Sequence, residues 1–451
     1  MSVSLIVLAA GKGTRMNSDL PKVLHRLGAA PLLHHALQAG QTLDPDQIVV
    51  IAGHGAAAVE KAARAFDNSV EVVLQAEQLG TGHAVAQAAS LLAGATGDAI
   101  VLYGDTPFVR SETLQAMLDA RVHNAVVVLG FEAADPGRYG RLITSGDTLE
   151  RIVEFKDASD AERAVTLCNS GVICADISVL FDLVSRVGNA NASGEYYLTD
   201  IIEIARAQGL SAGVVRCDED ETLGINTRAE LSMAEAAFQA RMRAEAMENG
   251  VTLTDPATTY FALDTVIGRD TTIGPNVVFG PRVTIESDAE IKAFCHLEGC
   301  HISRGASVGP FARLRPGAEL AEDVHVGNFV EIKNAVLDEG VKVGHLTYLG
   351  DAHVGEHTNI GAGTITCNYD GVNKHHTEIG PRVFIGSNTM LVAPVRVGRD
   401  AMTGSGSVIT ADVPAEAVAI GRARQVNKPG LAVKLFDMYK SVREKRQKEA
   451  Q

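Results

Sequence analysis

Residues 8–16 read Leu-Ala-Ala-Gly-Lys-Gly-Thr-Arg-Met and follow the apolar run Val3–Leu8, so a strand is expected to end in a glycine-rich loop. Glycine permits a tight turn and lets backbone N–H groups approach an anion, while Lys12, Arg15 and Lys22 add positive charge. The loop lacks the third glycine of a dinucleotide fingerprint and the Gly-Lys-Ser/Thr of a P-loop. It therefore predicts phosphate binding by a different strand-to-loop arrangement.

Length and composition limit the class of protein. A chain of 451 residues exceeds what one core usually serves, so two or three domains are expected. No apolar stretch approaches the ~20 residues that span a bilayer, and Met1-Ser2-Val3 has no basic segment before an apolar one, so we expect a cytoplasmic protein that does not bind membranes. The net charge of −15 argues against nucleic acid as a partner. Six cysteines without a Cys-x-x-Cys pair indicate reduced thiols.

Strand-like and helix-like patterns alternate through the first half of the chain. The apolar runs of strand length are Val3–Leu8, Gln47–Ala52, Val70–Leu74, Ala99–Leu102 and Ala125–Gly130, and the helical periods include Leu32–Ala39, Ala56–Phe66 and Ala84–Leu92. This alternation predicts a doubly wound α/β domain with a parallel sheet and helices on both faces. Ligands bind such sheets beyond the carboxyl ends of the strands, where the glycine-rich loop and Tyr103-Gly104-Asp105 both lie.

Asp105 is the leading candidate for a metal ligand, because it ends a predicted strand and faces the phosphate loop. Mg²⁺ suits this position, since it keeps several waters and takes only one or two carboxylates. The alternative is a turn aspartate that caps the helix expected near Ser111, and position alone does not separate the two. Asn226, read without further context, is an ordinary cap for the helix that follows it.

A change of composition after residue 227 marks a connection between domains. From Arg228 to Asn249 the chain is rich in Ala, Glu, Met and Arg and has no glycine or proline, which predicts a long exposed helix that Asn249-Gly250 ends. The expected organisation is a first domain over 1–227, a linker helix over 228–249 and a second domain over 250–451. The basic tail, residues 434–451, is expected to be a helical, solvated end, with a role beside a coenzyme's phosphates as the alternative.

The second domain carries a repeat of six residues. Aliphatic or equivalent residues recur at 267, 273, 279, 285, 291 and 297, at 302, 308, 314, 320, 326 and 332, at 337, 343 and 349, at 354, 360 and 366, and at 379, 385, 391, 397, 403 and 409; 22 of these 24 positions are apolar. Six-residue sides, three to a coil, predict a triangular parallel β-helix of eight coils, about 38 Å tall at ~4.8 Å per coil.

The repeat is broken once. Thr366 and Ile379 are thirteen residues apart instead of six, so seven extra residues are expected to project as a loop that contains Asn368-Tyr369-Asp370-Gly371. Insertions in a solenoid usually mark its binding face.

Polar residues near this loop suggest an anion site. Arg315 and Lys333 hold equivalent places in successive coils, so the two cations are expected to lie ~4.8 Å apart and to repel unless an anion joins them. Either a sugar phosphate binds there, or Glu319 or Glu331 neutralises the pair. His345 comes next along the helix, and an imidazole there could accept a proton from an ammonium nucleophile.

These motifs together resemble those of the bacterial bifunctional N-acetylglucosamine-1-phosphate uridylyltransferases and glucosamine-1-phosphate N-acetyltransferases along nearly the whole chain. The glycine-rich loop with its Pro21-Lys22, the segment Gln75-Ala76-Glu77-Gln78-Leu79-Gly80-Thr81-Gly82-His83-Ala84 and the string 194–200 carry the resemblance in the first domain. The repeat and the string around His345 carry it in the second.

The resemblance assigns roles in the first domain. It implies that Asp105 and Asn226 bind Mg²⁺, that Arg15 and Lys22 act in catalysis, and that UTP and the acetylamino sugar are bound by a larger set: Leu8, Ala9, Ala10, Gly11, Lys22, Gln75, Gly80, Thr81, Tyr103, Gly104, Asp105, Gly140, Glu154, Asn169 and Asn226.

In the second domain the resemblance implies a left-handed β-helix, a homotrimer and acetyl transfer from acetyl-coenzyme A, with His345 as the base. Glucosamine-1-phosphate would be bound by Arg315, Lys333, Tyr348 and Asn359, and acetyl-coenzyme A by Ala362, Asn368, Tyr369, Ser387, Ser405 and Arg422. Ser405 departs from the alanine common in that family. A zinc site at His353 with His357, or at His375 with His376, is disfavoured, because no third histidine follows at coil spacing.

Two other functions remain compatible with the sequence. The chain could make another nucleotide sugar with a β-helix that only regulates, or it could be a scaffold with an inert β-helix. Release of free thiol from acetyl-coenzyme A would exclude the first, and release of pyrophosphate would exclude the second.

Overall fold

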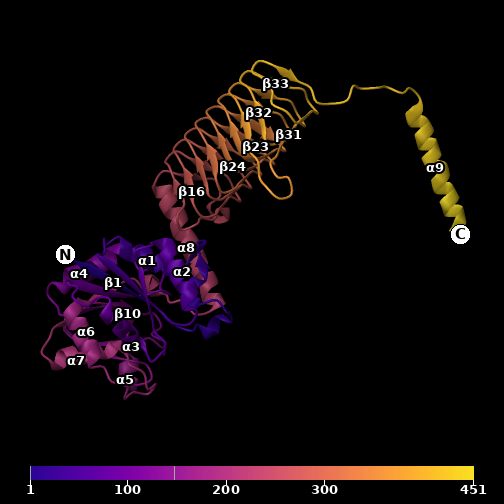
Figure 1. Cartoon of the computed structure of the whole chain (residues 1–451). Coiled ribbons are helices and arrows are strands. Elements are labelled where there is room, and N and C mark those ends of the chain that lie inside the picture. Colours follow the sequence, from indigo (N-terminus) through magenta and orange to yellow (C-terminus); the bar gives the residue numbers. More distant parts are fainter. Residues whose placement is uncertain (1, 147, 451) are drawn as a thin grey trace. The chain divides into compact units, whose positions relative to one another are not determined.

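The computed structural model describes residues 2–146 and 148–450; Met1 and Gln451, the ends of the predicted domains, lie outside them. The chain forms two compact units, one of residues 1–266 with 278–283 and one of residues 267–277 with 284–451 (Figure 1). This division differs from the predicted boundaries at 227 and 250, because helix α8 (Arg228–Glu248) and the chain directly after it belong to the first unit.

One large sheet forms the centre of the first unit, with strand order β11-β7-β10-β6-β1-β4-β5. These strands are β1 (Val3–Ala9), β4 (Gln47–Ala52), β5 (Glu71–Leu74), β6 (Asp98–Tyr103), β7 (Val126–Glu132), β10 (Leu167–Asp176) and β11 (Ala212–Cys217). The antiparallel strands β8 (Arg141–Ser145) and β9 (Thr148–Val153) join it through β10, and β2 (Arg26–Leu27) pairs separately with β3 (Ala30–Pro31). Every residue of β1 is buried, as expected of a strand covered on both faces.

Helices cover both faces of this sheet, as predicted (Figure 1). One face carries α1 (Leu32–Gln41), α2 (Ala56–Phe66) and α4 (Ser111–Arg121), and the other carries α3 (Thr81–Ala86), α6 (Ile177–Ser185) and α7 (Ile201–Ala207). The side chains of β1 alternate between the two cores, Leu5 and Val7 in one and Ile6 and Leu8 in the other.

The short elements of this unit are α5 (Asp160–Arg163), β12 (Thr252–Leu253) and 3-10 turns at Thr14–Met16, Lys22–Leu24, Gln87–Ser90, Leu198–Asp200, Glu219–Thr222 and Pro256–Thr258. The helix predicted over 84–92 instead begins at Thr81 and changes to a 3-10 turn after Ala86. No helix among the described residues is long and apolar enough to cross a membrane. All six cysteines are free thiols.

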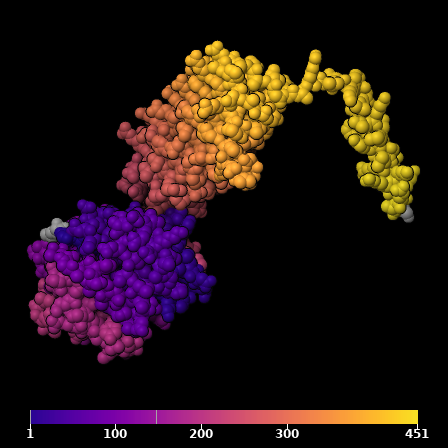
Figure 2. Space-filling view, in the orientation of Figure 1, coloured from indigo at the N-terminus to yellow at the C-terminus, as the bar shows by residue number. Residues whose placement is uncertain are grey.

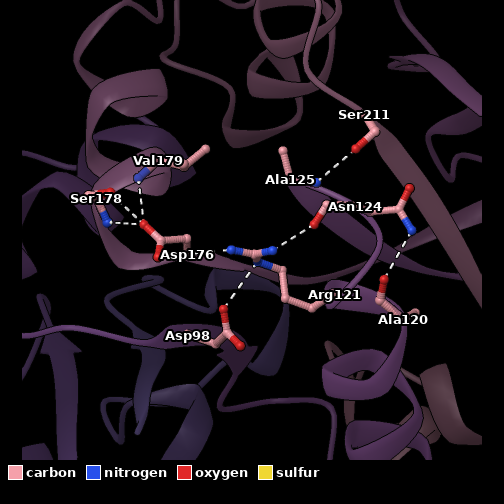
Figure 3. Close-up of polar contacts among 9 residues, drawn as sticks. All are labelled: Asp98, Ala120, Arg121, Asn124, Ala125, Asp176, Ser178, Val179 and Ser211. Carbon is pink, nitrogen blue, oxygen red and sulfur yellow. Dashed lines mark hydrogen bonds and ion pairs between the residues drawn. The ribbon is translucent and has the colours of Figure 1, made fainter. Parts of the chain in front are cut away.

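The sheet is mixed, which corrects the prediction of a parallel one. β10 runs antiparallel to both β6 and β7, so Asp176 pairs with Asp98 in the ladder. Arg121 lies between the two carboxylates, with Nε 3.1 Å from Asp98 and Nη2 3.9 Å from Asp176, and it also donates to the carbonyl oxygen of Asn124 (Figure 3). The apolar run of β10 has the composition of its parallel neighbours, so nothing in that pattern indicates the reversed direction.

Helix α8 has one buried side, which corrects the prediction of an exposed linker. Ala234 and Phe238 pack with Leu27, Leu32 and other residues of the first unit. A Cβ atom at Gly28 would clash with the Phe238 ring, so glycine at 28 makes this close approach possible. Thr227 and Glu230 form a capping box that begins the helix.

The second unit is a parallel β-helix with three sides. The first side holds β14 (Thr272–Ile273), β17 (Glu290–Ile291), β20 (Ser307–Val308), β23 (His325–Asn328), β25 (Lys342–His345), β27 (Asn359–Ile360), β30 (Phe384–Ile385), β33 (Met402–Thr403) and β35 (Val418–Ala419). The second holds β18 (His296–Leu297), β21 (Arg313–Leu314), β28 (Ile365–Cys367), β31 (Met390–Val392) and β34 (Val408–Ile409), while β15 (Val278–Phe279) lies in the segment that belongs to the first unit.

The third side holds β13 (Val266–Ile267), β16 (Val283–Ile285), β19 (Cys300–Ile302), β22 (Ala318–Leu320), β29 (Thr377–Ile379) and β32 (Val395–Val397). Strands β24 (Glu331–Leu337) and β26 (Tyr348–Val354) turn the corner between the second and third sides, because each pairs with strands of both. Helix α9 (Leu431–Glu449) follows the coils and has no buried residue.

The six-residue period marks the interior of this β-helix, as predicted. All the repeat positions are buried except Ile267, which is half-buried. The extra residues near 370 leave the coils as the orange loop of Figure 1, which also forms a separate bulge on the surface in Figure 2.

Candidate functional site

The glycine-rich loop after β1 is shaped around Lys22. Gly13 has φ of +59°, and a Cβ atom there would lie 2.6 Å from Cβ of Lys22, so both the backbone conformation and the close approach require glycine. Gly11 has open space where its Cβ would be, which leaves room for a ligand beside the backbone. Arg15, on the 3-10 turn Thr14–Met16, is exposed.

A cleft of about 340 Å³ opens at the carboxyl ends of the strands, where the α/β pattern predicted it. It brings together many of the residues that the resemblance pointed to: Leu8, Ala9, Ala10, Gly11, Lys22, Gln75, Gly80, Thr81, Tyr103 and Asp105. Val23, Gln78, Ala84 and Glu195 also line the cleft and had no role assigned from the sequence. Gln78, Ala84 and Glu195 lie within the quoted family strings, which was the one signal available for them.

Gly140, Glu154 and Asn169, for which the resemblance implied substrate binding, lie next to one another. Gly140 accepts a hydrogen bond from the backbone N–H of Asn169 at 2.8 Å, and a Cβ atom at Gly140 would lie 3.5 Å from Oε1 of Glu154. Thr199 donates to Glu154 at 3.2 Å, although burial still raises the pKa of that carboxyl above its ordinary value. Burial, followed by the charges of Glu203 and Glu154, raises the pKa of Asp200 to about 6. This corner is therefore acidic and poorly solvated.

Asp105 and Asn226 share a cation. The ammonium of Lys22 forms an ion pair with Asp105 and lies 2.9 Å from Oδ1 of Asn226, and the backbone N–H of Ile225 donates to the carbonyl oxygen of Asp105 at 3.0 Å. Two oxygens, one just after the end of β6 and one just before helix α8, thus converge on one positive charge. A carboxylate and an amide oxygen are donors that suit Mg²⁺.

The alternative roles considered for Asp105 and Asn226, in which each would cap a helix, do not match the structure. The residue that caps α4 is Arg110, without a side-chain hydrogen bond, so Asp105 does not cap that helix. The cap of α8 is Thr227, and the side chain of Asn226 faces Lys22 instead. Glu230 accepts from the backbone N–H groups of Asn226 and Thr227, which fixes Asn226 at the start of the helix.

Arg315 and Lys333 occupy successive coils of the second unit, as the repeat predicted. Leu314 pairs with Ile332 in the ladder, so Arg315 and Lys333, which follow these two residues, lie one coil apart. Arg315 donates to Glu331 at 2.8 Å, so the neutralisation considered as an alternative is present for that cation. Lys333 has no such partner among the described ion pairs, and the neighbouring Lys374, with Arg315, lowers the pKa of Lys333.

Lys374 is the residue of this site that sequence reasoning missed. It lies in the projecting loop, where no repeat position points to it, and the loop brings it back against Lys333. The three cations Arg315, Lys333 and Lys374 therefore face two carboxylates, Glu331 and Asp351, and one positive charge remains in excess. That excess favours an anionic ligand.

His345 ends β25 and is held by the coil beneath it. Asn328 pairs with His345 in the ladder, and its Oδ1 lies 2.5 Å from Nδ1 of the imidazole. Tyr348, three residues after His345, pairs with Glu331 in the parallel ladder of β24 and β26. Asn359 starts β27 and pairs with Lys342. His345 is exposed, and its Nε2 is not engaged by the described residues.

The predicted coenzyme residues fall into two groups. Ala362, Ser387 and Ser405 take equivalent places in successive coils, two residues after the inward positions 360, 385 and 403, and the carbonyl oxygen of Ser387 accepts from Gly406 at 2.8 Å. Arg422 is exposed just after β35.

The other two belong to the projecting loop. Asn368 is buried and donates to Asp351 at 2.5 Å, which anchors the base of the loop, and Tyr369 is 60% exposed. The structure thus gives Asn368 a structural contact and leaves the Tyr369 ring open to a partner molecule or ligand.

Comparison with known proteins agrees with this two-part organisation. A family model described as the MobA-like NTP transferase domain matches residues 5–167, and one for bacterial transferase hexapeptide repeats matches residues 264–299 and 376–411, which fits the left-handed coil expected. A protein of Cereibacter sphaeroides (strain ATCC 17025) named bifunctional protein GlmU is 76% identical over 98% of both chains. Proteins of the same name are 69% identical in Paracoccus denitrificans, over 96% of this chain and 97% of that one, and 65% identical in Ruegeria sp. strain TM1040, over 98% of both.

Proposed function

We infer that this chain, which belongs to the family of the bifunctional GlmU proteins, makes UDP-N-acetylglucosamine from glucosamine-1-phosphate by two group transfers. The first unit is a nucleotidyltransferase and the second a hexapeptide-repeat acetyltransferase. The observation that carries the proposal is the presence of two separate polar sites in one chain: a strand-end cleft with a shared cation, and a cluster of cations beside an open histidine.

Acetyl transfer takes place on the β-helix. The phosphate of glucosamine-1-phosphate binds the cations Arg315, Lys333 and Lys374, with Tyr348 and Asn359 near the sugar. Nε2 of His345 removes a proton from the ammonium group, and the amine attacks the carbonyl carbon of the acetyl thioester. The C–S bond breaks, and coenzyme A leaves as the thiol after protonation. Ala362, Asn368, Tyr369, Ser387, Ser405 and Arg422 form the coenzyme site.

Uridylyl transfer takes place in the cleft of the first unit. The phosphate oxygen of N-acetylglucosamine-1-phosphate attacks the α-phosphorus of UTP, and pyrophosphate leaves. Asp105 and Asn226 would hold Mg²⁺, which offsets charge on the transferring group. Lys22 and Arg15 bind the phosphates, and Gly140, Glu154 and Asn169 orient the sugar, so catalysis depends on positioning and electrostatics.

The assembly proposed is a homotrimer in the cytoplasm. A three-sided prism packs naturally with three-fold symmetry, and the exposed Tyr369 loop leaves its own coil in a way that suits a contact with a neighbouring copy. Acetyltransferase sites between subunits would follow from that contact.

One reaction tests the whole proposal. The protein is incubated with Mg²⁺, UTP, glucosamine-1-phosphate and acetyl-coenzyme A, and the nucleotide sugar, the free thiol and the pyrophosphate are measured. Formation of UDP-N-acetylglucosamine with one thiol and one pyrophosphate per product is expected. Pyrophosphate without thiol would indicate a different nucleotide-sugar enzyme, and neither product would indicate a scaffold.

A further inference from the structure

The side-chain amide of Gln75 is hydrogen-bonded through its nitrogen, whereas its oxygen is left for a ligand. Gln75 follows β5, is 2% exposed and lines the cleft of the first unit. Its Nε2 donates to the carbonyl oxygen of Gly80 at 3.1 Å and lies 3.0 Å from Nδ1 of His83. Its Oε1 has no hydrogen-bond partner among the described residues and is not enclosed away from the cleft.

His83 lies between two amides and cannot accept from both. Its Nδ1 faces Nε2 of Gln75, and its Nε2 lies 3.2 Å from Nε2 of Gln87. A neutral imidazole has one lone pair and one N–H, so one neighbouring amide donates to the ring and the other must accept from it. The ring therefore couples the orientations of the two amides.

The carbonyl oxygen of Gly80 decides which amide donates. If the Gln75 amide were turned over, its oxygen would face that carbonyl oxygen, and two oxygens would lose their donor in a buried place. Gln87 is only half-buried, and turning its amide costs one bond to the carbonyl oxygen of His83, which water can replace. Nδ1 of His83 thus accepts from Gln75, and its Nε2–H points to Gln87.

We propose that His83 is a positioning residue for base selection: it holds Nε2 of Gln75 and so presents Oε1 to the cleft as an acceptor. A pyrimidine with a ring N–H, as uracil has at N3, satisfies that oxygen. Cytosine has a lone pair at N3 and would place it against the oxygen, which leaves both without a donor. His83 therefore favours uridine over cytidine nucleotides without touching the base. This inference rests on the proposed uridylyl transfer.

Three variants test the inference. His83→Leu removes the acceptor at similar size, His83→Asn keeps an acceptor oxygen near the place of Nδ1, and Gln87→Ala removes the other amide. Pyrophosphate release is measured with N-acetylglucosamine-1-phosphate and either UTP or CTP. We expect His83→Leu to lower the UTP-to-CTP ratio of kcat/KM at least about tenfold, chiefly through a higher KM for UTP. The other two variants should stay within about threefold of the unaltered protein.

The outcomes separate this inference from the function beneath it. An unchanged ratio in His83→Leu, with UTP still turned over, would overturn the role of His83 alone. Failure of the unaltered protein to use UTP would overturn the proposed function. If thermal unfolding shows that the leucine variant does not fold, His83→Ala makes the same change with a smaller side chain, and an unchanged ratio there counts equally against the inference.

Discussion

Asn328 lies one coil from His345 in the parallel ladder, and its Oδ1 is 2.5 Å from Nδ1 of the imidazole. An amide oxygen accepts from N–H, so this contact places the ring proton on Nδ1 and leaves the lone pair of Nε2 for the substrate. A partner that fixes the tautomer of a histidine usually matters for its function as a base.

Asn328→Ala should therefore lower the rate of acetyl transfer by about 10- to 100-fold, because the ring loses its orientation but keeps its base. Asn328→Asp provides the matched comparison, since a carboxylate still accepts from Nδ1–H and should move the acidic limb of the pH profile. Thiol release is the measurement. An alanine variant with an unaltered rate and pH profile would show that the contact does not support the base.

Arg121 should be important for the stability of the first unit. It separates the carboxylates of Asp98 and Asp176, whose side chains are 13% and 32% exposed. Arg121→Met would leave these two charges facing one another, at a cost of about 2–4 kcal/mol in the free energy of unfolding, below the full cost for a completely buried pair. Urea unfolding measures it.

Arg64→Met is the control for this change, because Arg64 pairs with Glu60 on an exposed helix surface. Its effect should be below about 0.5 kcal/mol. Equal effects of the two substitutions would mean that the reversed strand β10 does not depend on Arg121.

The charged form of His353 should stabilise the fold, so the contribution of this residue to the free energy of unfolding should depend on pH. Burial disfavours that charge, but Glu378 and Asp338, at 2.8 and 2.9 Å, outweigh it and raise the pKa of His353 above 6.5. A raised pKa in the folded state gives stability that is present below 6.5 and is lost as pH rises through the folded value. His353→Gln should therefore destabilise by roughly 0.5 kcal/mol at low pH and by less at high pH. A difference that grows with pH would contradict this sign.

The proposed trimer predicts complementation between inactive subunits. His345→Ala removes the base, and deletion of 369–373 removes the exposed tip of the projecting loop while Lys374 remains. If one subunit lends its loop to the histidine of the next, a mixed trimer contains a site with both parts intact, and some thiol release should return when the two variants are unfolded and refolded together. A monomeric mass by light scattering in a fully active preparation would rule out shared sites.

Periodicity explains why much of the fold could be predicted. Residues such as Leu314 and Ile332 repeat at a fixed spacing that only an inward-facing position requires, and the nearly continuous apolar run of Val3–Ala9 likewise reflects burial on two faces. Strand direction has no such signature, so the reversal of β10 was not predictable, and neither was the side of α8 on which Phe238 lies.

The candidate sites, like the fold, could be predicted only in part. Motif spacing made Asp105 and His345 candidates, but it could not show that Lys22 bridges Asp105 and Asn226, or that the loop returns Lys374 to Lys333. Nor could it show the partners Asn328 and His83, because those contacts depend on which coil or turn lies against which.

The most direct test of two independent sites uses Asp105→Ala and His345→Ala. The first should abolish pyrophosphate release and keep thiol release. The second should lower thiol release ~100- to 10,000-fold and leave uridylylation of supplied N-acetylglucosamine-1-phosphate unchanged. An equal mixture of both should again convert glucosamine-1-phosphate to UDP-N-acetylglucosamine. Loss of both activities in either folded variant, or no product from the mixture, would contradict two separate sites acting in sequence.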